Sequence, residues 1–204
     1  MVMGLRDMFA QYTGFAIAGF NVFGYEDANA VIRAAEKCEL PVILMVNRDA
    51  ASYIPLHVIG PMLDQMARTA KVPVGVHLDH AVELSAIREA VECRFTSVMF
   101  DGSQLSMEEN IAKTLETIAI TRDRNISVEA EIGSVGYSDP AVKAHQEYTE
   151  PEDAKRFYEA TRVDCLAVSV GTVHRMTTEK VTIQYDRLKR IQQAVSAPLV
   201  IHGA

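Results

Sequence analysis

VPVGVHLDHA, residues 72–81, is the stretch that decides the fold, because it is apolar almost throughout and ends in an acid and a histidine. A strand that is covered on one face alternates polar and apolar side chains, whereas a strand covered on both faces reads as a nearly continuous apolar run. The stretch therefore predicts a buried strand of a parallel sheet, with Asp79 and His80 at its C-terminal end.

Six further runs of the same kind occur along the chain. They are FAIAGFNV (15–22), PVILMV (41–46), TSVMFD (96–101), ISVEAEIG (126–133), DCLAVSVG (164–171) and APLVIHG (197–203). Amphipathic stretches lie between them, and residues 28–35 carry apolar side chains at the i, i+3, i+4, i+7 spacing of one helix face. Another helix is expected to begin at Pro151, after Thr149 or Glu150. Strands that alternate with helices indicate an α/β fold with a parallel sheet.

The residues at the ends of these runs distinguish a doubly wound sheet from a barrel. A doubly wound sheet usually carries a GxGxxG loop after its first strand, and NVFGYED (21–27) lacks that pattern. A (β/α)8 TIM barrel places its chemistry at the C-terminal ends of many strands. Polar residues gather at those ends, namely Asn21, Asn47, Asp79, His80, Asp101, Glu131, His174 and His202. We therefore expect a TIM barrel that forms a single domain over residues 1–204. Because such a barrel has eight strands and about 250 residues, we expect this one to be truncated after strand seven.

Composition and charge narrow the functional classes. The net charge of −7, without a cluster of Lys and Arg, argues against a nucleic-acid-binding protein. No apolar run reaches the length of a membrane span, and the N-terminus has no signal-peptide core. Cys38, Cys93 and Cys165 form no CxxC pair, so we expect three buried thiols in a reducing compartment. A cytoplasmic enzyme or binding protein fits these features.

Three histidines, His80, His174 and His202, lie near the ends of different predicted strands. Three imidazoles that converge from different strands are a ligand set for a catalytic zinc ion with an open position for substrate. The alternative is that a histidine at a strand end forms a structural hydrogen bond. That alternative is our expectation for the other three histidines, which are His57, His77 and His145, although His77 shares its strand parity with Asp79.

Two glutamates of the fifth run have the same strand parity. Glu129 and Glu131 are both expected to face inward, where an unpaired carboxylate is costly. One or both must then meet a cation, which can be a metal ion or a Lys or Arg side chain.

Seven segments, in order, resemble the class II (metal-dependent) fructose-bisphosphate and tagatose-bisphosphate aldolase family. They are FNVFGYEDANAVIRAAE (20–36), HLDHA (77–81), TSVMFDGS (96–103), VEAEIG (128–133), YTEPEDAKRF (148–157), VSVGTVH (168–174) and LVIHGA (199–204). The resemblance runs from about residue 5 to the last residue. It implies a (β/α)8 barrel and an aldehyde-lyase that reversibly cleaves a fructose- or tagatose-type ketose 1,6-bisphosphate to dihydroxyacetone phosphate and an aldehyde. It also implies a cytoplasmic enzyme of carbohydrate metabolism or glycolysis, assembled as a homodimer or homotetramer.

The resemblance also implies roles for individual residues. His80, His174 and His202 would hold Zn2+, which stabilises the enediolate left when the C3–C4 bond breaks. Asp79 would take the proton of the C4 hydroxyl. Asp101 and Glu131 would be alternative metal ligands or acceptors for the N–H groups of the ligating imidazoles. Zinc, cobalt and iron all accept imidazole ligands, and a second monovalent or divalent cation is compatible with the site.

Other implied positions include departures from the family pattern. Asp139, in the loop after the fifth run, would exchange the proton at C3, where family members commonly carry Glu. The implied contacts to a phosphosugar substrate are Asn21, Asn47, Gly171, Arg175 and Gly203. Arg175 stands where a glycine is normal, and Asn47 stands where Ser is frequent.

Two other functional interpretations stay open. The chain could be a non-catalytic aldolase-like barrel fragment or binding protein, because strands one and seven would have unpaired edges without an eighth strand. A zinc hydrolase on the same fold would prefer a His-X-His pair on the first strand, and GFNVFG (19–24) contains no histidine.

Overall fold

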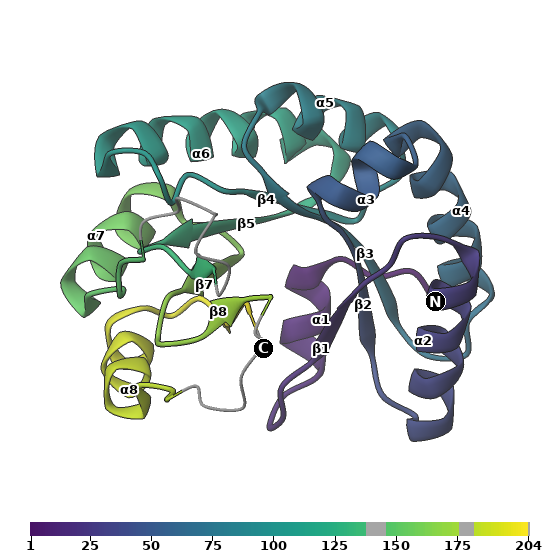
Figure 1. Cartoon of the computed structure of the whole chain (residues 1–204), viewed down its shortest axis with the longest axis horizontal. Helices are drawn as coiled ribbons and strands as arrows, with labels where there is room; N and C mark the ends of the chain where they lie inside the picture. Colours follow the sequence, from purple (N-terminus) through teal and green to yellow (C-terminus); the bar gives the residue numbers. More distant parts are fainter. Residues whose placement is uncertain (138–145, 176–181, 204) are drawn as a thin grey trace. The chain divides into compact units, whose positions relative to one another are not determined.

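The structure is a computed structural model, and it describes residues 1–137, 146–175 and 182–203 (Figure 1). The chain divides into two compact units. Unit 1 comprises residues 1–100 and 117–128, and unit 2 comprises residues 101–116 and 129–204. The expectation of one domain over residues 1–204 stays a prediction.

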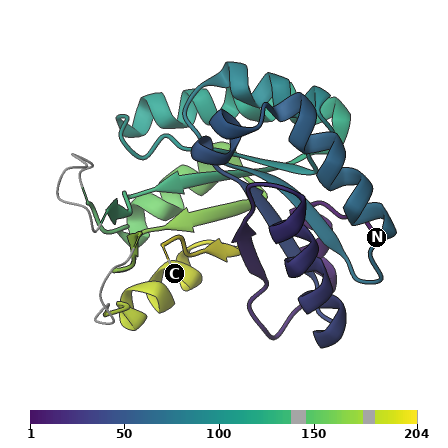
Figure 2. The same cartoon turned by 45° about the vertical axis from the view of Figure 1, so that its right-hand side comes forward.

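Unit 1 contains the first four strands of the parallel sheet and the helices that connect them. Its elements are α1 (Leu5–Gln11), β1 (Ala18–Asn21), α2 (Tyr25–Cys38), β2 (Val42–Val46), α3 (Arg48–Tyr53), α4 (Leu56–Thr69), β3 (Val74–Ala81), α5 (Leu84–Glu92) and β4 (Ser97–Phe100). The end of α6 (Met107–Thr121), the 3-10 turn η1 (Arg122–Arg124) and the start of β5 (Ser127–Ile132) also belong to this unit. Helix α4 contacts α2 and α5, and these three helices cover one face of β2, β3 and β4 (Figures 1 and 2).

Unit 2 continues the sheet and adds a small second one. Its elements are the first turns of α6, most of β5, β6 (Gly136–Tyr137), α7 (Pro151–Thr161), β7 (Cys165–Val168), β8 (Val173–His174), α8 (Tyr185–Ala194) and β9 (Leu199–Val200). Strands β5, β7 and β9 are parallel neighbours, and β6 pairs with β8 in a separate two-stranded sheet. Helices α7 and α8 pack against each other. Helix α7 begins at Pro151 with Glu150 as its N-cap, which confirms the predicted helix start.

The strand order confirms the α/β prediction and the winding of a TIM barrel. The parallel strands follow the order β1-β2-β3-β4-β5-β7-β9, and each contains part of one predicted run. The amide of Ser127 donates to the carbonyl of Thr96, which continues the sheet from β4 to β5 inside unit 1. Sequential order without a reversal is the winding of a barrel, whereas a doubly wound sheet reverses at a switch point.

Burial of β3, β4, β5 and β7 matches the prediction from the apolar runs, whereas the exposure of β1 does not. All eight residues of β3 are buried, as are all residues of β4, β5 and β7. All four residues of β1, the first strand in the order, are exposed. Within the described ranges, no helix is long and apolar enough to span a membrane.

One prediction about the cysteines is wrong. Cys93 and Cys165 are buried as expected, but Cys38 is exposed. Cys38 is the last residue of α2, whose buried face is formed by Ala28, Ile32 and Ala35 in the preceding turns. The helix has left the core by its last turn, so the thiol of Cys38 reaches solvent.

Gly60 allows α4 to approach the turn between α5 and β4. A Cβ at this position would lie 2.2 Å from the carbonyl oxygen of Cys93 and 2.8 Å from the ring of Phe95. We expect Gly60→Ala to lower the free energy of unfolding by about 1–3 kcal/mol in urea titrations, because the backbone must move to admit the methyl group. An ordinary helical Gly→Ala change adds about 1 kcal/mol instead.

Gly24→Ala is the matched control for this prediction. A Cβ at Gly24 would meet nothing closer than 3.8 Å, and the residue has an extended backbone that any residue adopts. Equal effects of the two substitutions would contradict a close approach at Gly60.

Candidate metal centre

The C-terminal end of β3 presents Asp79 and His80 from an irregular strand. Leu78 pairs with Val98 and Ala81 pairs with Phe100, so β3 holds one more residue than β4 over this interval. This is a β-bulge, a device that redirects side chains and is common beside active sites. His80 has a φ of 52°, a left-handed conformation that costs a non-glycine residue about 1–2 kcal/mol. Sequence patterning gave no sign of this bulge.

Asp79 and His80 are nearly inaccessible to solvent, at 3% and 8% exposure. Oδ1 of Asp79 lies 3.9 Å from Nε2 of His80. Backbone strain of this kind persists only where the surrounding structure imposes it, and it concentrates at functional sites. The bulge therefore marks the end of β3 as a candidate site in unit 1.

Of the histidines outside the predicted ligand set, His77 forms the expected structural hydrogen bond, whereas His57 makes only a longer contact with an acid at the surface. Nδ1 of His77 lies 2.9 Å from Oγ of Ser97, and the ring is 1% exposed, so His77 is a structural residue of the sheet. His57 is exposed, and its Nδ1 lies 3.8 Å from Glu89 on α5. His145 lies outside the described residues.

In unit 2, a buried carboxylate contacts one of the predicted metal ligands. Oε1 of Glu129, on β5, lies 2.7 Å from Nε2 of His202, just after β9. The two side chains are 3% and 5% exposed. The sequence predicted a metal ion or a Lys or Arg side chain beside Glu129, Glu131 or both, and the structure instead identifies the imidazole of His202 as a partner of Glu129. The strand positions alone did not reveal this pairing, because it joins residues on β5 and after β9.

The second oxygen of Glu129 contacts a thiol. Sγ of Cys165, which faces Glu129 across the β5–β7 register, lies 3.6 Å from Oε2 and donates a weak hydrogen bond. Burial, with added repulsion from Glu129 and Asp164, raises the pKa of the Cys165 thiol well above its usual range. Cys165 therefore stays protonated and remains a donor at neutral pH.

His174 lies beside His202. The ring centroids are 6.2 Å apart, with an angle of 49° between the ring planes. Gly203 permits this approach, because it has a φ of 72° and its Cβ would lie 2.6 Å from the carbonyl carbon of Val173. Thr172 adds a hydrogen bond from its hydroxyl to the carbonyl of His202. Unit 2 thus places two imidazoles and one carboxylate together.

The carboxylates predicted near the metal are held by local donors. Oε1 of Glu131, which is 1% exposed, accepts the amide N–H of Val135 at 3.1 Å. Oδ1 of Asp101 accepts both the amide and the hydroxyl of Ser103, at 3.1 and 2.6 Å. These bonds fix the orientation of both carboxylates.

The predicted substrate contacts lie at strand ends with varied local roles. Asn47 caps α3, since its Oδ1 accepts the amide N–H of Ala50 at 2.9 Å. Asn21 is exposed at the end of β1. Gly171 has a φ of 113°, and Arg175 has a φ of 52° and an exposed side chain. The substrate roles of these residues and of Gly203 stay predictions. Asp139 lies outside the described residues.

The three thiols differ in their accessibility to solvent, and alkylation tests this difference. At pH 8 iodoacetamide should alkylate Cys38 in the native chain and spare Cys93 and Cys165, since burial raises the pKa of both thiols and blocks the reagent. Intact-mass spectrometry before and after denaturation measures the number of adducts. A Cys38→Ser variant should remain unmodified until it unfolds. Modification of Cys165 at the rate of Cys38 would refute its burial against Glu129.

A model of class-II fructose-bisphosphate aldolases matches residues 5–204 of the chain. The chain is 34% identical over 200 residues to a 6-phospho-5-dehydro-2-deoxy-D-gluconate aldolase of Shouchella clausii, with 96% of this chain and 68% of that protein covered. It is 34% identical over 195 residues to a fructose-bisphosphate aldolase of Giardia intestinalis, with 93% and 60% covered.

Solved structures agree with these sequence matches. The crystal structure of the YdjI aldolase from Escherichia coli K12 superposes with a TM-score of 0.88 and 34% sequence identity. The match covers all of this chain and 74% of that one. The chain thus spans between about 60% and three quarters of the length of these proteins.

Proposed function

We infer the function from the family, because the chain belongs to the class-II fructose-bisphosphate aldolase family, whose members are lyases. Within that family we propose a zinc-dependent aldolase. It reversibly cleaves a ketose 1,6-bisphosphate of the fructose or tagatose type to dihydroxyacetone phosphate and an aldehyde. The observation that carries the proposal is the buried Glu129–His202 contact beside His174.

The chemistry of this group fits a divalent cation. An ionised Glu129 only accepts hydrogen bonds, so Nε2 of His202 would carry the proton, and in the neutral imidazole Nδ1 would then present its lone pair. Metal-ligating histidines ordinarily donate their other ring N–H to such an acceptor, which fixes the tautomer and raises the basicity of the ligand. Glu129 does this for His202, and Cys165 holds the opposite oxygen of Glu129.

We propose that His80 of unit 1, together with His174 and His202 of unit 2, holds Zn2+, with Asp101 and Glu131 as further oxygen donors. The family and the ligand types support this set. When bound, the cation supplies Lewis-acid polarisation of the ketone oxygen and the adjacent hydroxyl oxygen. A second monovalent or divalent cation remains part of the proposal.

Asp79 is proposed to move the reacting proton. Its carboxylate takes the proton of the C4 hydroxyl during cleavage and returns it when the C3–C4 bond forms. The position on the β3 bulge, with 3% exposure, keeps bulk water away from that proton. Asp139 is proposed to exchange the proton at C3.

The proposed substrate is a phosphosugar held by Asn21, Asn47, Gly171, Arg175 and Gly203. The guanidinium of Arg175 can bind a phosphate through paired N–H donors where a glycine would offer only backbone. The names of the two relatives give different phosphorylated substrates, a 6-phospho-5-dehydro-2-deoxy-D-gluconate and a fructose bisphosphate, so the assay should include both. A cytoplasmic homodimer or homotetramer in carbohydrate metabolism completes the proposal.

The proposed zinc ligands predict how four substitutions affect the zinc content of the protein. His80→Ala and His174→Ala should each remove most of the bound zinc measured by mass spectrometry of the purified protein. Glu129→Gln should weaken zinc affinity about 10- to 100-fold, because the acceptor that orients His202 loses its charge. His57→Ala is the control and should leave the zinc content unchanged. Equal zinc content in all four variants would exclude these ligands.

The aldolase reaction predicts a chelation-sensitive activity. Coupled detection of triose phosphate from fructose 1,6-bisphosphate should be abolished by a chelator and restored by Zn2+. Asp79→Asn should lower kcat about 10²- to 10⁴-fold with zinc content intact, since the general base is lost. Asp186→Asn, an exposed acid on α8, should not change kcat. A borohydride-trapped Schiff base in place of chelator sensitivity would instead reveal a lysine mechanism.

A further inference from the structure

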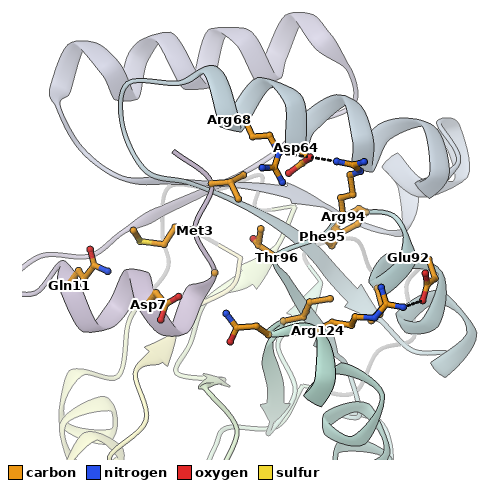
Figure 3. A pocket seen from close by; sticks show the side chains of 15 residues that line it. Met3, Asp7, Gln11, Asp64, Arg68, Glu92, Arg94, Phe95, Thr96 and Arg124 are labelled. Carbon is orange, nitrogen blue, oxygen red and sulfur yellow. Dashed lines mark hydrogen bonds and ion pairs between the residues drawn. The ribbon is translucent and has the colours of Figure 1, made fainter.

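A cavity of about 590 Å³ lies in unit 1 at the N-terminal ends of the strands (Figure 3). Met3 lines it and donates its amide to the carbonyl of Val74, the first residue of β3. Thr96 and Ile126 line it immediately before β4 and β5. Asp79 and His80 lie at the opposite end of β3. His80 lies six positions after Val74, which is roughly 20 Å along an extended strand. The cavity is therefore distinct from the candidate metal centre.

The cavity wall holds two guanidinium groups on one buried carboxylate. Oδ2 of Asp64 accepts from Nε of Arg68 at 2.9 Å and from Nη1 of Arg94 at 3.3 Å. The Asp64 side chain is 4% exposed, whereas Arg68 and Arg94 are 54% and 63% exposed. This group carries one more positive than negative charge, while the lining as a whole is neutral, because Asp7 and Glu92 add two negative charges and Arg124 adds one positive charge. Each contact to Asp64 uses one nitrogen of a fork that carries five N–H donors.

The backbone places this group at a conformational cost. Gly60 lets α4 meet the turn after α5, and Asp64 and Arg68 follow on the same face of α4, one and two turns later. Arg94 occupies the left-handed position after α5, with a φ of 67°, where glycine is the usual residue. A side chain there costs about 1–2 kcal/mol relative to glycine. From this helix-ending position the guanidinium of Arg94 reaches Asp64 at the cavity wall.

The opposite wall, formed by α1, is polar and carries one amide and one carboxylate side chain. Figure 3 shows Gln11 and Asp7, both on α1, across the cavity from the Arg68–Asp64–Arg94 group. Asn125 also lines the cavity. The third lining arginine, Arg124, is bound to Glu92 at 2.9 Å and points toward it in Figure 3. Amide and carboxylate groups across the cavity from a guanidinium pair suit the hydroxyl groups of a ligand.

We propose that this cavity binds a small hydroxylated phosphate monoester, with the phosphate on Arg68 and Arg94 and the hydroxyl groups toward α1. Arginine forks match the geometry of phosphate oxygens and form charge-assisted hydrogen bonds with them. A volume of about 590 Å³ is in the range of pockets that enclose small ligands. The site lies wholly in unit 1 and needs no metal.

Amide NMR of the 15N-labelled chain tests the site, with chelator present and ionic strength held constant. Inorganic phosphate and glycerol 3-phosphate are the probes. Saturating shifts are expected at the amides of Arg94, Thr96, Asn125 and Ile126. Glycerol 3-phosphate should bind more tightly than inorganic phosphate. Shifts that grow linearly without saturation, or saturate only at residues beside His80 and Gly171, would overturn the proposal.

Variants separate binding from folding. Arg94→Gly should weaken phosphate binding at least about tenfold because one charge-assisted contact is lost. It should also fold, because glycine suits the left-handed backbone at this position. Gln11→Ala should reduce the advantage of glycerol 3-phosphate and leave the affinity for inorganic phosphate unchanged. Arg122→Gln, an exposed arginine outside the cavity lining, is the control. Equal affinities in Arg94→Gly and Arg122→Gln would overturn the proposal.

Discussion

Burial of β3 on both faces is the constraint on which the candidate site at the end of this strand depends. Every residue from Val74 to Ala81 is buried, so no polar group of the strand can rely on bulk water. His77, in the middle, meets Ser97 on the neighbouring strand. Asp79 and His80, at one end, are polar groups held in a bulge rather than in a regular ladder. Buried polar groups at a strand end are costly without a partner or a ligand, which is why we place the proposed chemistry at this edge.

The same constraint operates in unit 2 on Glu129. All of β5 is buried, and its inward carboxylate needs partners that the strand itself cannot supply. The partners come from β7 and from the segment after β9, as the thiol of Cys165 and the imidazole of His202. The parallel register decides which residues face Glu129. Replacement of the carboxylate would therefore change the orientation of His202 as well as the charge.

The sequence predicted the strands and helices well because both depend on short-range periodicity. The apolar runs locate all seven strands of the main sheet, and the Glu150–Pro151 step locates the start of α7. It did not predict the β3 bulge or the partners of Glu129, because these depend on register between strands distant in sequence. The exposure of Cys38 was missed since periodicity does not show where a helix leaves the core.

The described non-glycine residues with positive φ fall into two groups. Among the described residues, six non-glycine residues have positive φ. Four of them, Glu39, Arg94, Asn125 and Arg162, follow helices or a 3-10 turn, where a left-handed residue ends the helix. The other two, His80 of unit 1 and Arg175 of unit 2, follow no helix; we propose the first as a metal ligand and the second as a substrate contact. Their strain has no helix-ending explanation, which favours a functional one.

The two proposed sites lie at opposite ends of the strands that they share, and this limits how one can affect the other. Coupling between sites requires an element with two discrete arrangements that both ligands bias. Strand β3 is buried throughout and hydrogen-bonded to β2 and β4, so a second arrangement within unit 1 would have to break that pairing. A ligand on Arg68 and Arg94 would instead tie α4 to the turn after α5 and stabilise the folded unit by mass action, in proportion to RT ln(1 + [L]/Kd). We therefore expect a ligand in the cavity to raise the stability of the fold rather than to control catalysis directly.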